Sequence, residues 1–420
     1  MIVRGTIRPP GDKSITHRAL MLGAHARGST ELRHPLTAED ARSTARVLRQ
    51  LGATVSPLRR GQSTSVHGEP WTEPAGTLHC GNAGTAARLM MGLLAAHPFP
   101  SRVTGDRSLR GRPMDRVTTP LRIMGAAIEG RGDRLPLVVR GGRLRSLSYV
   151  SPVASAQVKG AILFAGLAAG VDVTVREPWR SRDHTERLLT YLGFDVRVEA
   201  TAVTLAGADP MALRSFSLDV PADPSSAAFL AAAAVLAEGG ELLIEGVGVN
   251  PTRTGFLRVL ARMGASIDLI NGREAGGEPV ADLMVRPAQL RGVTVDAHEI
   301  PSLVDEVPVL AVVASRAAGE SVFRGVGELR VKESNRLELV AANLRAIGVA
   351  AEASGDDLTV AGHEAPPVGR VHTAHDHRLT MAFAVAGTLP GAAVALSERA
   401  SAGVSYPGFF DDLATIGAAS

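Results

Sequence analysis

The 420-residue sequence contains 45 Lys and Arg and 42 Asp and Glu, which gives a formal net charge of +3, and only 4% of its residues are aromatic. These values argue against a nucleic-acid-binding protein, which concentrates positive charge and often stacks bases on aromatic rings. The single cysteine, Cys80, excludes an internal disulfide framework and a metal site built from several cysteines. At this length we expect two domains of about 200 residues each.

The N-terminal residues 1–10 alternate as a β-strand does and contain arginine and proline, so they lack the apolar core of a signal peptide. Further along, glycine, proline or charge interrupts every apolar stretch before it reaches the roughly 18 residues of a membrane span. We therefore expect a cytoplasmic protein that does not insert into a membrane.

The first predicted helix begins within residues 11–18, which read Gly-Asp-Lys-Ser-Ile-Thr-His-Arg and precede the apolar run 19–24. The N-terminus of a helix attracts anions, because its backbone N–H groups are unpaired and the helix dipole is positive there. A cation in the first turn opposes that dipole by about 0.3–1 kcal/mol. Lys13 and Arg18 therefore indicate an anion-binding corner, in which Ser14 supplies a hydroxyl.

Two patterns recur along the chain. In the first, an apolar helix ends at a glycine that fits a helix C-cap; the six glycines, spaced by 73, 68, 71, 84 and 69 residues, are Gly52, Gly125, Gly193, Gly264, Gly348 and Gly417. In the second, a polar corner precedes an alanine-rich helix, a turn and a strand, in segments 12–32, 82–103, 155–175, 223–244, 305–323 and 376–394. Six copies of alternating helices and strands predict an α/β fold with two pseudo-threefold domains.

A domain boundary is expected near residues 219–224, where prolines separate the third and fourth copies. The first strand, residues 2–8, precedes the first copy and could pair with the last one, which places a second crossing near residues 11–13. We therefore expect one domain of residues 1–12 and 221–420, an inserted domain of residues 13–220, and hinges near 11–14 and 220–224.

The polar corners of the first half contain several candidate anion ligands. Residues 81–88 include Gly84 and form a glycine-containing helix entry, which can bring backbone N–H groups close to an anion. Ser155 and Gln157 offer a hydroxyl and an amide at the next entry, although each corner alone also fits an ordinary helix cap. Arg112 lies in the arginine-rich loop 107–116, and Arg182 precedes a short helix; guanidinium groups suit carboxylates and phosphates.

The second half adds carboxylates to this pattern. Asp305 and its neighbour Glu306 interrupt an apolar stretch, which fits either a general base with a raised pKa or an acidic N-cap. Lys332 and Arg336 are one turn apart at a helix start, with Glu333 between them as a candidate acid or base. Arg378 follows a His-x-His pattern at 375–377, but no third ligand is evident and we expect no metal.

Only three of the 45 basic residues are lysines: Lys13, Lys159 and Lys332. A chain that otherwise uses arginine has reason to keep lysine where a compact, titratable ammonium matters, although chance retention at the surface is the alternative. No Walker sequence or dinucleotide fingerprint is present. Two small, highly anionic substrates would suit a cleft between the two halves that is lined by the cations Lys13, Arg18, Arg112, Arg182, Lys332, Arg336 and Arg378.

Eight motifs, in the order in which they occur, resemble those of the 5-enolpyruvylshikimate-3-phosphate (EPSP) synthases over essentially the whole chain. They are Gly-Asp-Lys-Ser at 11–14, Asn-Ala-Gly-Thr at 82–85, Arg-Pro-Met at 112–114, Ser-Ala-Gln-Val-Lys at 155–159, Arg-Asp-His-Thr-Glu at 182–186, Asn-Pro-Thr-Arg at 250–253, Val-Lys-Glu-Ser at 331–334 and Asp-His-Arg at 376–378. Several look like the class II bacterial branch noted for glyphosate tolerance, whereas Gly84 is the residue associated with sensitivity.

The resemblance implies a two-domain inside-out α/β barrel with six βαβαββ repeats, three per domain. It also implies a cofactor-independent, monomeric transferase that moves the enolpyruvyl group of phosphoenolpyruvate to the 5-hydroxyl of shikimate 3-phosphate. Shikimate 3-phosphate would be bound by Lys13, Ser14, Arg18, Ser155, Ala156, Gln157, Arg182, Asp305 and Lys332. Phosphoenolpyruvate would be bound by Lys13, Gly84, Arg112, Gln157, Arg336 and Arg378. Asp305 would be the base, with Glu333 and Lys13 as the proton-transfer pair.

Two positions depart from the family pattern. Asn335 stands where many relatives have Asp, so a carboxylate role there is absent. Residues 401–405 contain no lysine before Tyr406, where many relatives have one that contacts phosphoenolpyruvate.

The sequence distinguishes this activity from two alternative functions. The sister transferases that act on UDP-N-acetylglucosamine typically have Asn after the N-terminal lysine and Cys in the loop before Arg-Pro, whereas this chain has Ser14 and no cysteine within 104–112. A non-catalytic anion-binding homologue would have no need to retain Lys13, Asp305 and Glu333 together. The sequence therefore favours the shikimate 3-phosphate enzyme over both.

Overall fold

The computed structural model describes residues 1–417, which form two compact units. Unit 1 contains residues 1–10, 222–273 and 279 onward; unit 2 contains residues 11–221 and 274–278. The chain therefore passes four times from one unit to the other, because the tip of one hairpin belongs to unit 2. Among these residues, no helix combines the length and the apolar character that crossing a bilayer requires.

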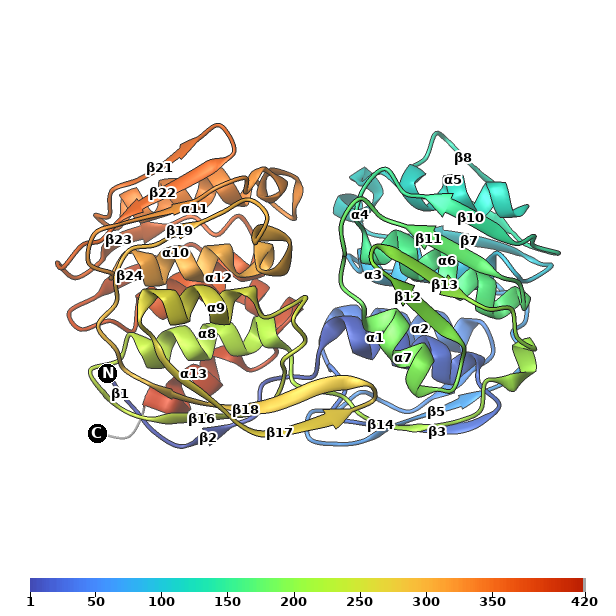
Figure 1. Cartoon of the computed structure of the whole chain (residues 1–420), viewed down its shortest axis with the longest axis horizontal. Helices are drawn as coiled ribbons and strands as arrows, with labels where there is room; N and C mark the ends of the chain where they lie inside the picture. The colour runs from blue at the N-terminus through green and yellow to red at the C-terminus, as the bar shows by residue number, and fades with distance from the viewer. Residues whose placement is uncertain (418–420) are drawn as a thin grey trace. The chain divides into compact units, whose positions relative to one another are not determined.

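Unit 2 contains three four-stranded sheets with one shared design (Figure 1). In each sheet the first strand is parallel to the second, and the remaining pairs are antiparallel. In sheet order the strands are β14 (Ser217–Asp219), β3 (Gly28–Arg33), β5 (Thr64–Gly68) and β4 (Thr54–Val55); β6 (Leu78–His79), β7 (Pro100–Thr104), β9 (Leu137–Arg140) and β8 (Ala127–Gly130); and β10 (Leu147–Val150), β11 (Val173–Arg176), β13 (Ala202–Leu205) and β12 (Val196–Glu199). Because β14 is the last strand of the unit and pairs with β3 of the first copy, the three repeats close into a ring.

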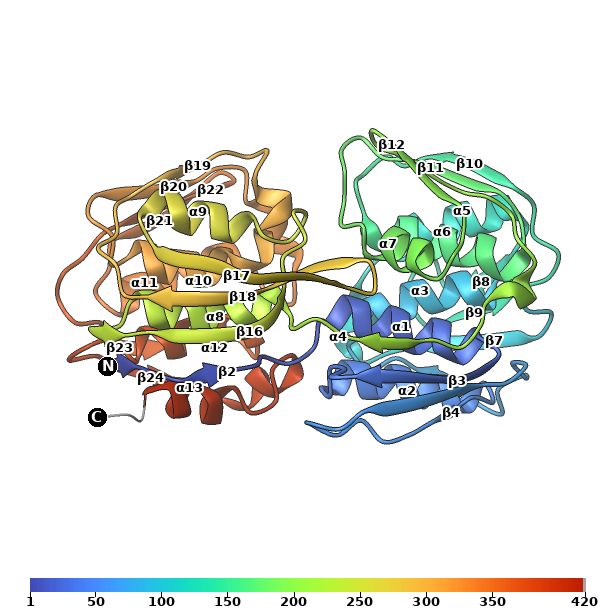
Figure 2. The same ribbon diagram turned by 60° about the horizontal axis from the view of Figure 1, so that its bottom comes forward.

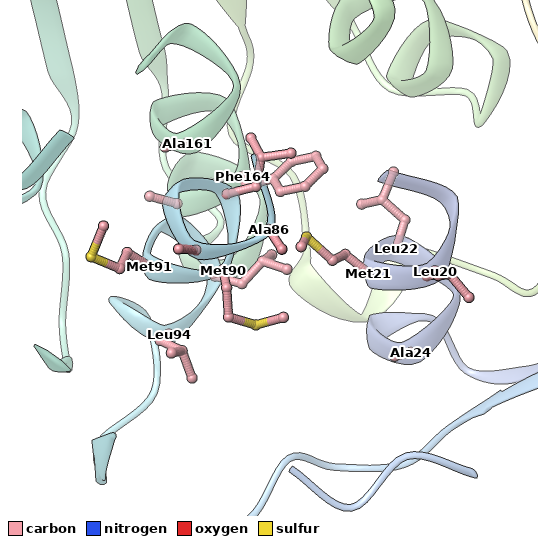
Figure 3. Packing of buried hydrophobic residues seen from close by; sticks show 14 of the residues in the cluster. Leu20, Met21, Leu22, Ala24, Ala86, Met90, Met91, Leu94, Ala161 and Phe164 are labelled. Carbon is pink, nitrogen blue, oxygen red and sulfur yellow. The ribbon is translucent and has the colours of Figure 1, made fainter. Parts of the chain in front are cut away.

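Three apolar helices fill the interior of unit 2: α1 (Lys13–His25), α3 (Gly84–Leu94) and α6 (Ala156–Ala169). Helix α6 carries apolar residues on all of its faces, as expected for a helix that is buried on every side. Figure 3 shows Met21, Ala86 and Phe164 pointing into the space between these helices. A Cβ at Gly92 would lie 2.2 Å from the carbonyl oxygen of Ala161, so small residues permit the close approach of α3 and α6.

The remaining helices of unit 2 are more amphipathic and more exposed: α2 (Glu39–Gln50), α4 (Arg107–Gly111), α5 (Asp115–Met124) and α7 (His184–Tyr191). Their apolar faces pack inward while their polar faces carry the arginines and acids of the repeat pattern. Helices inside and sheets outside give unit 2 the inside-out barrel arrangement.

Unit 1 repeats this design with a modified last copy (Figure 2). Its strands, in sheet order, are β17 (Ser266–Ala275), β18 (Glu278–Arg286), β16 (Leu242–Gly248) and β2 (Thr6–Ile7); β19 (Thr294–Val295), β20 (Glu320–Phe323), β22 (Asp357–Ala361) and β21 (Ala351–Ser354); β23 (Val368–Val371) and β24 (Ala393–Leu396); and β1 (Ile2–Val3) and β15 (Gly239–Gly240). The inner helices are α8 (Pro224–Val235), α10 (Val307–Ala314) and α12 (His377–Ala386), and the outer ones are α9 (Gly255–Met263), α11 (Arg336–Ala346) and α13 (Phe409–Gly417).

The predicted repeat pattern is confirmed in detail. Each of the six segments that begin at a polar corner forms an inner helix followed by a strand: α1 and β3, α3 and β7, α6 and β11, α8 and β16, α10 and β20, and α12 and β24. Five of the six repeat glycines end an outer helix with a left-handed backbone, at φ between 88° and 115°. The sixth, Gly417, is the last residue of α13.

The predicted pairing of residues 2–8 with the last copy is wrong. β1 pairs with β15 and β2 pairs with β16, and both partners belong to the fourth copy. The reason is that, within residues 1–417, the strands of the last copy are β23 and β24, which pair with each other and are followed by helix α13. The last copy contacts the N-terminal segment through α13, where the N–H of Arg4 donates to the carbonyl of Ile416 at 3.1 Å.

Candidate active site

The N-termini of the inner helices carry most of the predicted site residues. In unit 2, α1 begins at Lys13, and the Asp12 side chain caps it by accepting from the N–H of Ile15 at 2.8 Å. The Lys13 ammonium lies 3.3 Å from the carboxylate of Asp40 on α2, and its side chain is 26% exposed. Lys13 therefore remains reachable by a ligand while Asp40 restrains its position.

Arg18 connects three helices of unit 2. Its guanidinium donates to Thr185 Oγ1 on α7 at 2.8 Å, to the Ser14 carbonyl at 2.9 Å and to the Ala156 carbonyl at 3.4 Å. Burial lowers the pKa of Arg18 to about 10, while the negative charge of Glu186 opposes this shift. At neutral pH the guanidinium is thus a fixed positive charge, held by neutral oxygen acceptors.

The N-terminus of α6 adds Ser155, Ala156 and Gln157 to this region. The Ser155 hydroxyl caps the helix by accepting from the N–H of Val158 at 3.4 Å. The Gln157 amide nitrogen donates to Thr85 Oγ1 at 3.0 Å, and its oxygen accepts from Arg88 at 2.9 Å. Hydrogen bonds therefore link α6 to α3 through Gln157 and to α1 through the Ala156 carbonyl.

A second group of cations surrounds the start of α3. Arg112 donates to the Asn82 side chain at 2.8 Å. A Cβ on Gly84 would lie 2.8 Å from Arg88 Nη1 and 3.4 Å from Arg112 Nη1, so the absence of a side chain lets two guanidinium groups approach the helix N-terminus. Burial lowers the pKa of Arg88 to about 10, and the nearby charges of Arg112 and Arg116 add to that shift. Such a concentration of positive charge suits a small dianion.

Arg182 is half-buried just before α7, and its charge disfavours protonation of Arg18. The two cations therefore lie close enough to repel each other, which an intervening phosphate would relieve. Unit 2 carries nine of the predicted site residues, and their part in binding stays a prediction: Lys13, Ser14, Arg18, Gly84, Arg112, Ser155, Ala156, Gln157 and Arg182.

In unit 1, the predicted base lies among three cations. The Asp305 carboxylate is 3.7 Å from Lys332, 3.5 Å from Arg336 and 3.8 Å from Arg378. Arg378 also donates to the Asp305 backbone carbonyl at 3.0 Å. The structure thus brings together four residues from three separate polar corners.

Arg336 holds the second part of this cluster. It is buried, it forms a bidentate pair with Asp376 at 2.8 and 3.2 Å, and it contacts Glu333 at 2.5 Å. Although burial opposes its charge, the attraction of Glu333 and Asp376 raises the pKa of Arg336 above its ordinary value. Burial alone would raise the pKa of Asp376, but Arg336 holds it below the usual range. Glu333 itself stays 30% exposed, in reach of a ligand.

The comparisons with known proteins agree with one another. The family model for EPSP synthase (3-phosphoshikimate 1-carboxyvinyltransferase) matches residues 2–413. The chain belongs to the EPSP synthase family. A 3-phosphoshikimate 1-carboxyvinyltransferase of Thermus thermophilus is 50% identical, with 100% of this chain and 97% of the relative covered. One of Gloeobacter violaceus is 49% identical, with 98% and 96% covered.

Solved structures give the same result. An EPSP synthase of Acinetobacter baumannii superimposes with a TM-score of 0.90 at 38% identity, covering 99% of this chain and 95% of that one. The enolpyruvyl transferase NikO of Streptomyces tendae has a TM-score of 0.80 at 18% identity, with 99% and 95% covered, and this likeness concerns the fold alone. The two-domain inside-out α/β barrel is therefore confirmed.

The two departures from the pattern of EPSP synthases have structural roles here. Asn335 is the N-cap of α11 and accepts from the N–H of Glu338 at 3.4 Å. In the lysine-free segment 401–405, Ser401 donates its N–H and hydroxyl to Glu398, at 2.9 and 2.5 Å. Burial works against ionisation of Glu398, but the hydrogen bonds from Ser401 and two threonines keep its pKa below the ordinary value. This segment is a hydrogen-bonded 3₁₀ turn.

Several residues that contact the predicted ligands were not themselves predicted as ligands. Thr185, which holds Arg18, and Asp376, which holds Arg336, belong to recognised motifs but resemble ordinary helix-cap residues in sequence. Arg88 lies one turn into α3, where only the fold shows that it meets Gln157. Within residues 1–417, no group of three or more His, Cys, Asp or Glu side chains is arranged to hold a metal ion.

Proposed function

We propose that this chain transfers the enolpyruvyl group of phosphoenolpyruvate to the 5-hydroxyl of shikimate 3-phosphate and releases phosphate. Family membership across the whole chain supports this reaction. The observation that carries the residue assignment is the Asp305 carboxylate held 3.5–3.8 Å from Lys332, Arg336 and Arg378. A carboxylate among cations can accept a hydroxyl proton beside an anionic substrate.

Shikimate 3-phosphate is bound mainly by unit 2 in this proposal. Its phosphate suits the buried charge of Arg18 and the nearby Arg182, because a dianion relieves the repulsion between them. The other contacts would come from Lys13, Ser14, Ser155, Ala156, Gln157, Asp305 and Lys332. The expectation that the two halves close around the substrates stays a prediction.

Phosphoenolpyruvate would occupy the arginine-rich region around Gly84. Arg112 lies beside this residue, and the missing side chain leaves room at the N-terminus of α3. The further ligands in this assignment are Lys13, Gln157, Arg336 and Arg378. Monomeric state and cytoplasmic location also stay predictions from the sequence.

The reaction proceeds by addition and elimination. Asp305 takes the proton of the 5-hydroxyl, the oxygen bonds to C2 of phosphoenolpyruvate, and the methylene carbon accepts a proton from the pair formed by Glu333 and Lys13. In the second step the C2–O bond to phosphate breaks and the new methyl group loses a proton, which restores the enol ether. The arginines stabilise the negative charge that collects on the departing phosphate.

Phosphate release from purified protein with both substrates tests this proposal. We expect release with shikimate 3-phosphate and none with UDP-N-acetylglucosamine; the reverse result would assign the chain to the sister reaction. Binding of both substrates without release would instead indicate a non-catalytic homologue. Asp305→Asn is the matched variant, because it keeps the size of the side chain and removes the base, so it should bind shikimate 3-phosphate and release phosphate about 10²–10⁴-fold more slowly.

A further inference from the structure

Lys159, the lysine without a part in the proposed reaction, lies at the centre of a buried ion triad in unit 2. Its ammonium is 2.8 Å from Glu177 and 2.7 Å from Glu186, and all three side chains are at most 4% exposed. An ammonium withdrawn from water is stable only when paired and hydrogen-bonded. The surface explanation that the sequence left open for this lysine is therefore excluded.

One arm of the triad reaches the first turn of α6. Glu177 accepts the N–H of Ser155 at 2.7 Å and the hydroxyl of Ser181 at 2.8 Å. Ser155 is the N-cap of α6, and Ser181 precedes Arg182 in the chain. A single carboxylate, oriented by Lys159, thus contacts two of the segments assigned to shikimate 3-phosphate, through the backbone of Ser155 and the hydroxyl of Ser181.

The other arm reaches the residue that orients Arg18. Glu186 follows Thr185, whose hydroxyl accepts the hydrogen bond from Arg18. The charge of Glu186 favours the protonated form of Arg18 and so offsets the burial of that guanidinium. One carboxylate oxygen of Glu186 has no hydrogen-bond partner, and burial raises the pKa of this carboxyl. Without the ammonium of Lys159, the charged form of Glu186 would be destabilised at this buried position.

We propose that Lys159 is a positioning residue for shikimate 3-phosphate: by joining Glu177 to Glu186 it sets the first turn of α6 and the Thr185–Arg18 contact in a single arrangement. This inference rests on the proposed function. The triad should affect shikimate 3-phosphate more than phosphoenolpyruvate. Gln157, which is assigned to both substrates, is held by Thr85 and Arg88 on α3 and not by the triad.

The test compares Lys159→Met with wild type in two measurements, calorimetric binding of shikimate 3-phosphate alone and steady-state phosphate release. We expect the Kd and KM for shikimate 3-phosphate to rise about 10- to 100-fold, since small displacements of binding groups have effects of that size. The KM for phosphoenolpyruvate should stay within about threefold. Equal changes in both KM values, or an unchanged Kd, would overturn the proposal.

Two further variants complete the design. Leu205→Ala removes a buried side chain from β13 of the same repeat and should lower the melting temperature without changing the Kd, which separates positioning from general stability. Glu177→Gln keeps the shape of the triad and weakens its hold on Ser155; it decides the question if Lys159→Met does not fold, and an unchanged Kd again counts against the proposal. Wild-type protein that binds shikimate 3-phosphate without releasing phosphate would refute the proposed reaction while leaving the role of Lys159 measurable by calorimetry.

Discussion

The inner helices of the two units begin with different chemistry. In unit 1 all three N-caps are acidic, and each contacts an arginine: Asp223 with Arg253 at 3.2 Å, Glu306 with Arg378 at 3.4 Å and Asp376 with Arg336 at 2.8 Å. In unit 2 only one of the three N-caps, Asp12, is acidic, and the other two are Ala83 and Ser155.

This difference separates two tasks within one repeated architecture. A carboxylate at a helix N-terminus satisfies the unpaired N–H groups and neutralises the helix dipole. Unit 1 therefore fixes its arginines with internal acids, and in the proposed function it would offer the carboxylate of Asp305 for proton transfer. Unit 2 leaves positive charge near its helix N-termini, in Lys13, Arg88 and Arg112, which suits phosphate groups of the substrates.

The largest expected effect distinguishes the lysines of the two units. Lys13→Ala should lower kcat by about 10²–10⁴-fold, because it removes a proton-transfer partner. Lys332→Ala, the matched variant in unit 1, should mainly raise the KM for shikimate 3-phosphate. Phosphate-release kinetics measure both, and circular dichroism checks that the partly exposed Lys13 is dispensable for folding. A near-normal kcat in Lys13→Ala would show that Lys13, the residue of unit 2 assigned to proton transfer, is not catalytic.

A stability measurement tests the acidic caps. Arg336→Met leaves the buried Asp376 without its ion-pair partner and should reduce the free energy of unfolding by about 3–5 kcal/mol. In unit 2, Arg88 donates hydrogen bonds to two uncharged acceptors, the Gln157 side chain and the Pro113 carbonyl. Arg88→Met removes these bonds and should reduce the free energy of unfolding by about 1 kcal/mol. Urea unfolding of both variants gives the comparison. Equal losses would show that the acidic cap adds nothing to the hold on Arg336.

Acid should weaken unit 2 through its buried histidines. Burial lowers the pKa of His17, His25 and His97 from 6.5 to about 4. Between pH 6.5 and pH 4 these histidines are therefore protonated in the unfolded chain and neutral in the folded chain. Stability is therefore present above pH 6.5 and is lost as the pH falls toward 4, by about 3 kcal/mol for a fully buried histidine such as His17.

Amide hydrogen exchange of α1 and α3, measured from pH 7.5 to 4.5, follows this loss. His97→Phe is the control, because its ring can keep the stack with Trp71 and does not titrate. It should reduce the loss of protection on acidification. The same pH profile in the variant and in wild type would show that His97 does not contribute.

The smallest effect concerns the space beside α3. Gly84→Ala places a methyl group 2.8 Å from the Arg88 guanidinium, which must shift. We expect the KM for phosphoenolpyruvate to rise about fivefold, equivalent to about 1 kcal/mol, and the KM for shikimate 3-phosphate to change little. Steady-state kinetics with each substrate varied in turn decide this. A larger change for shikimate 3-phosphate would reverse the substrate assignment within unit 2.

Sequence reasoning singled out polar residues that lie at the starts of helices. Asp305, Lys332, Arg336 and Arg378 were predicted because each lies at a polar corner before a helix, and the structure gathers them around one carboxylate. Their partners were harder to predict. Asp376 lies 40 residues from Arg336, and Thr185 lies 167 residues from Arg18. Nothing in the local pattern of a cap residue reveals which distant cation it meets.

The sequence by itself determined the six repeats, the order of inner helices and strands, and the family, because these depend on periodicity, helix caps and short motifs that act locally. Only the tertiary structure decided where residues 2–8 pair, that residues 274–278 return to unit 2, and that Lys159 joins two buried carboxylates. These features follow from how the repeats close on themselves and which charges burial forces together, and such long-range contacts leave no periodic signal in the chain.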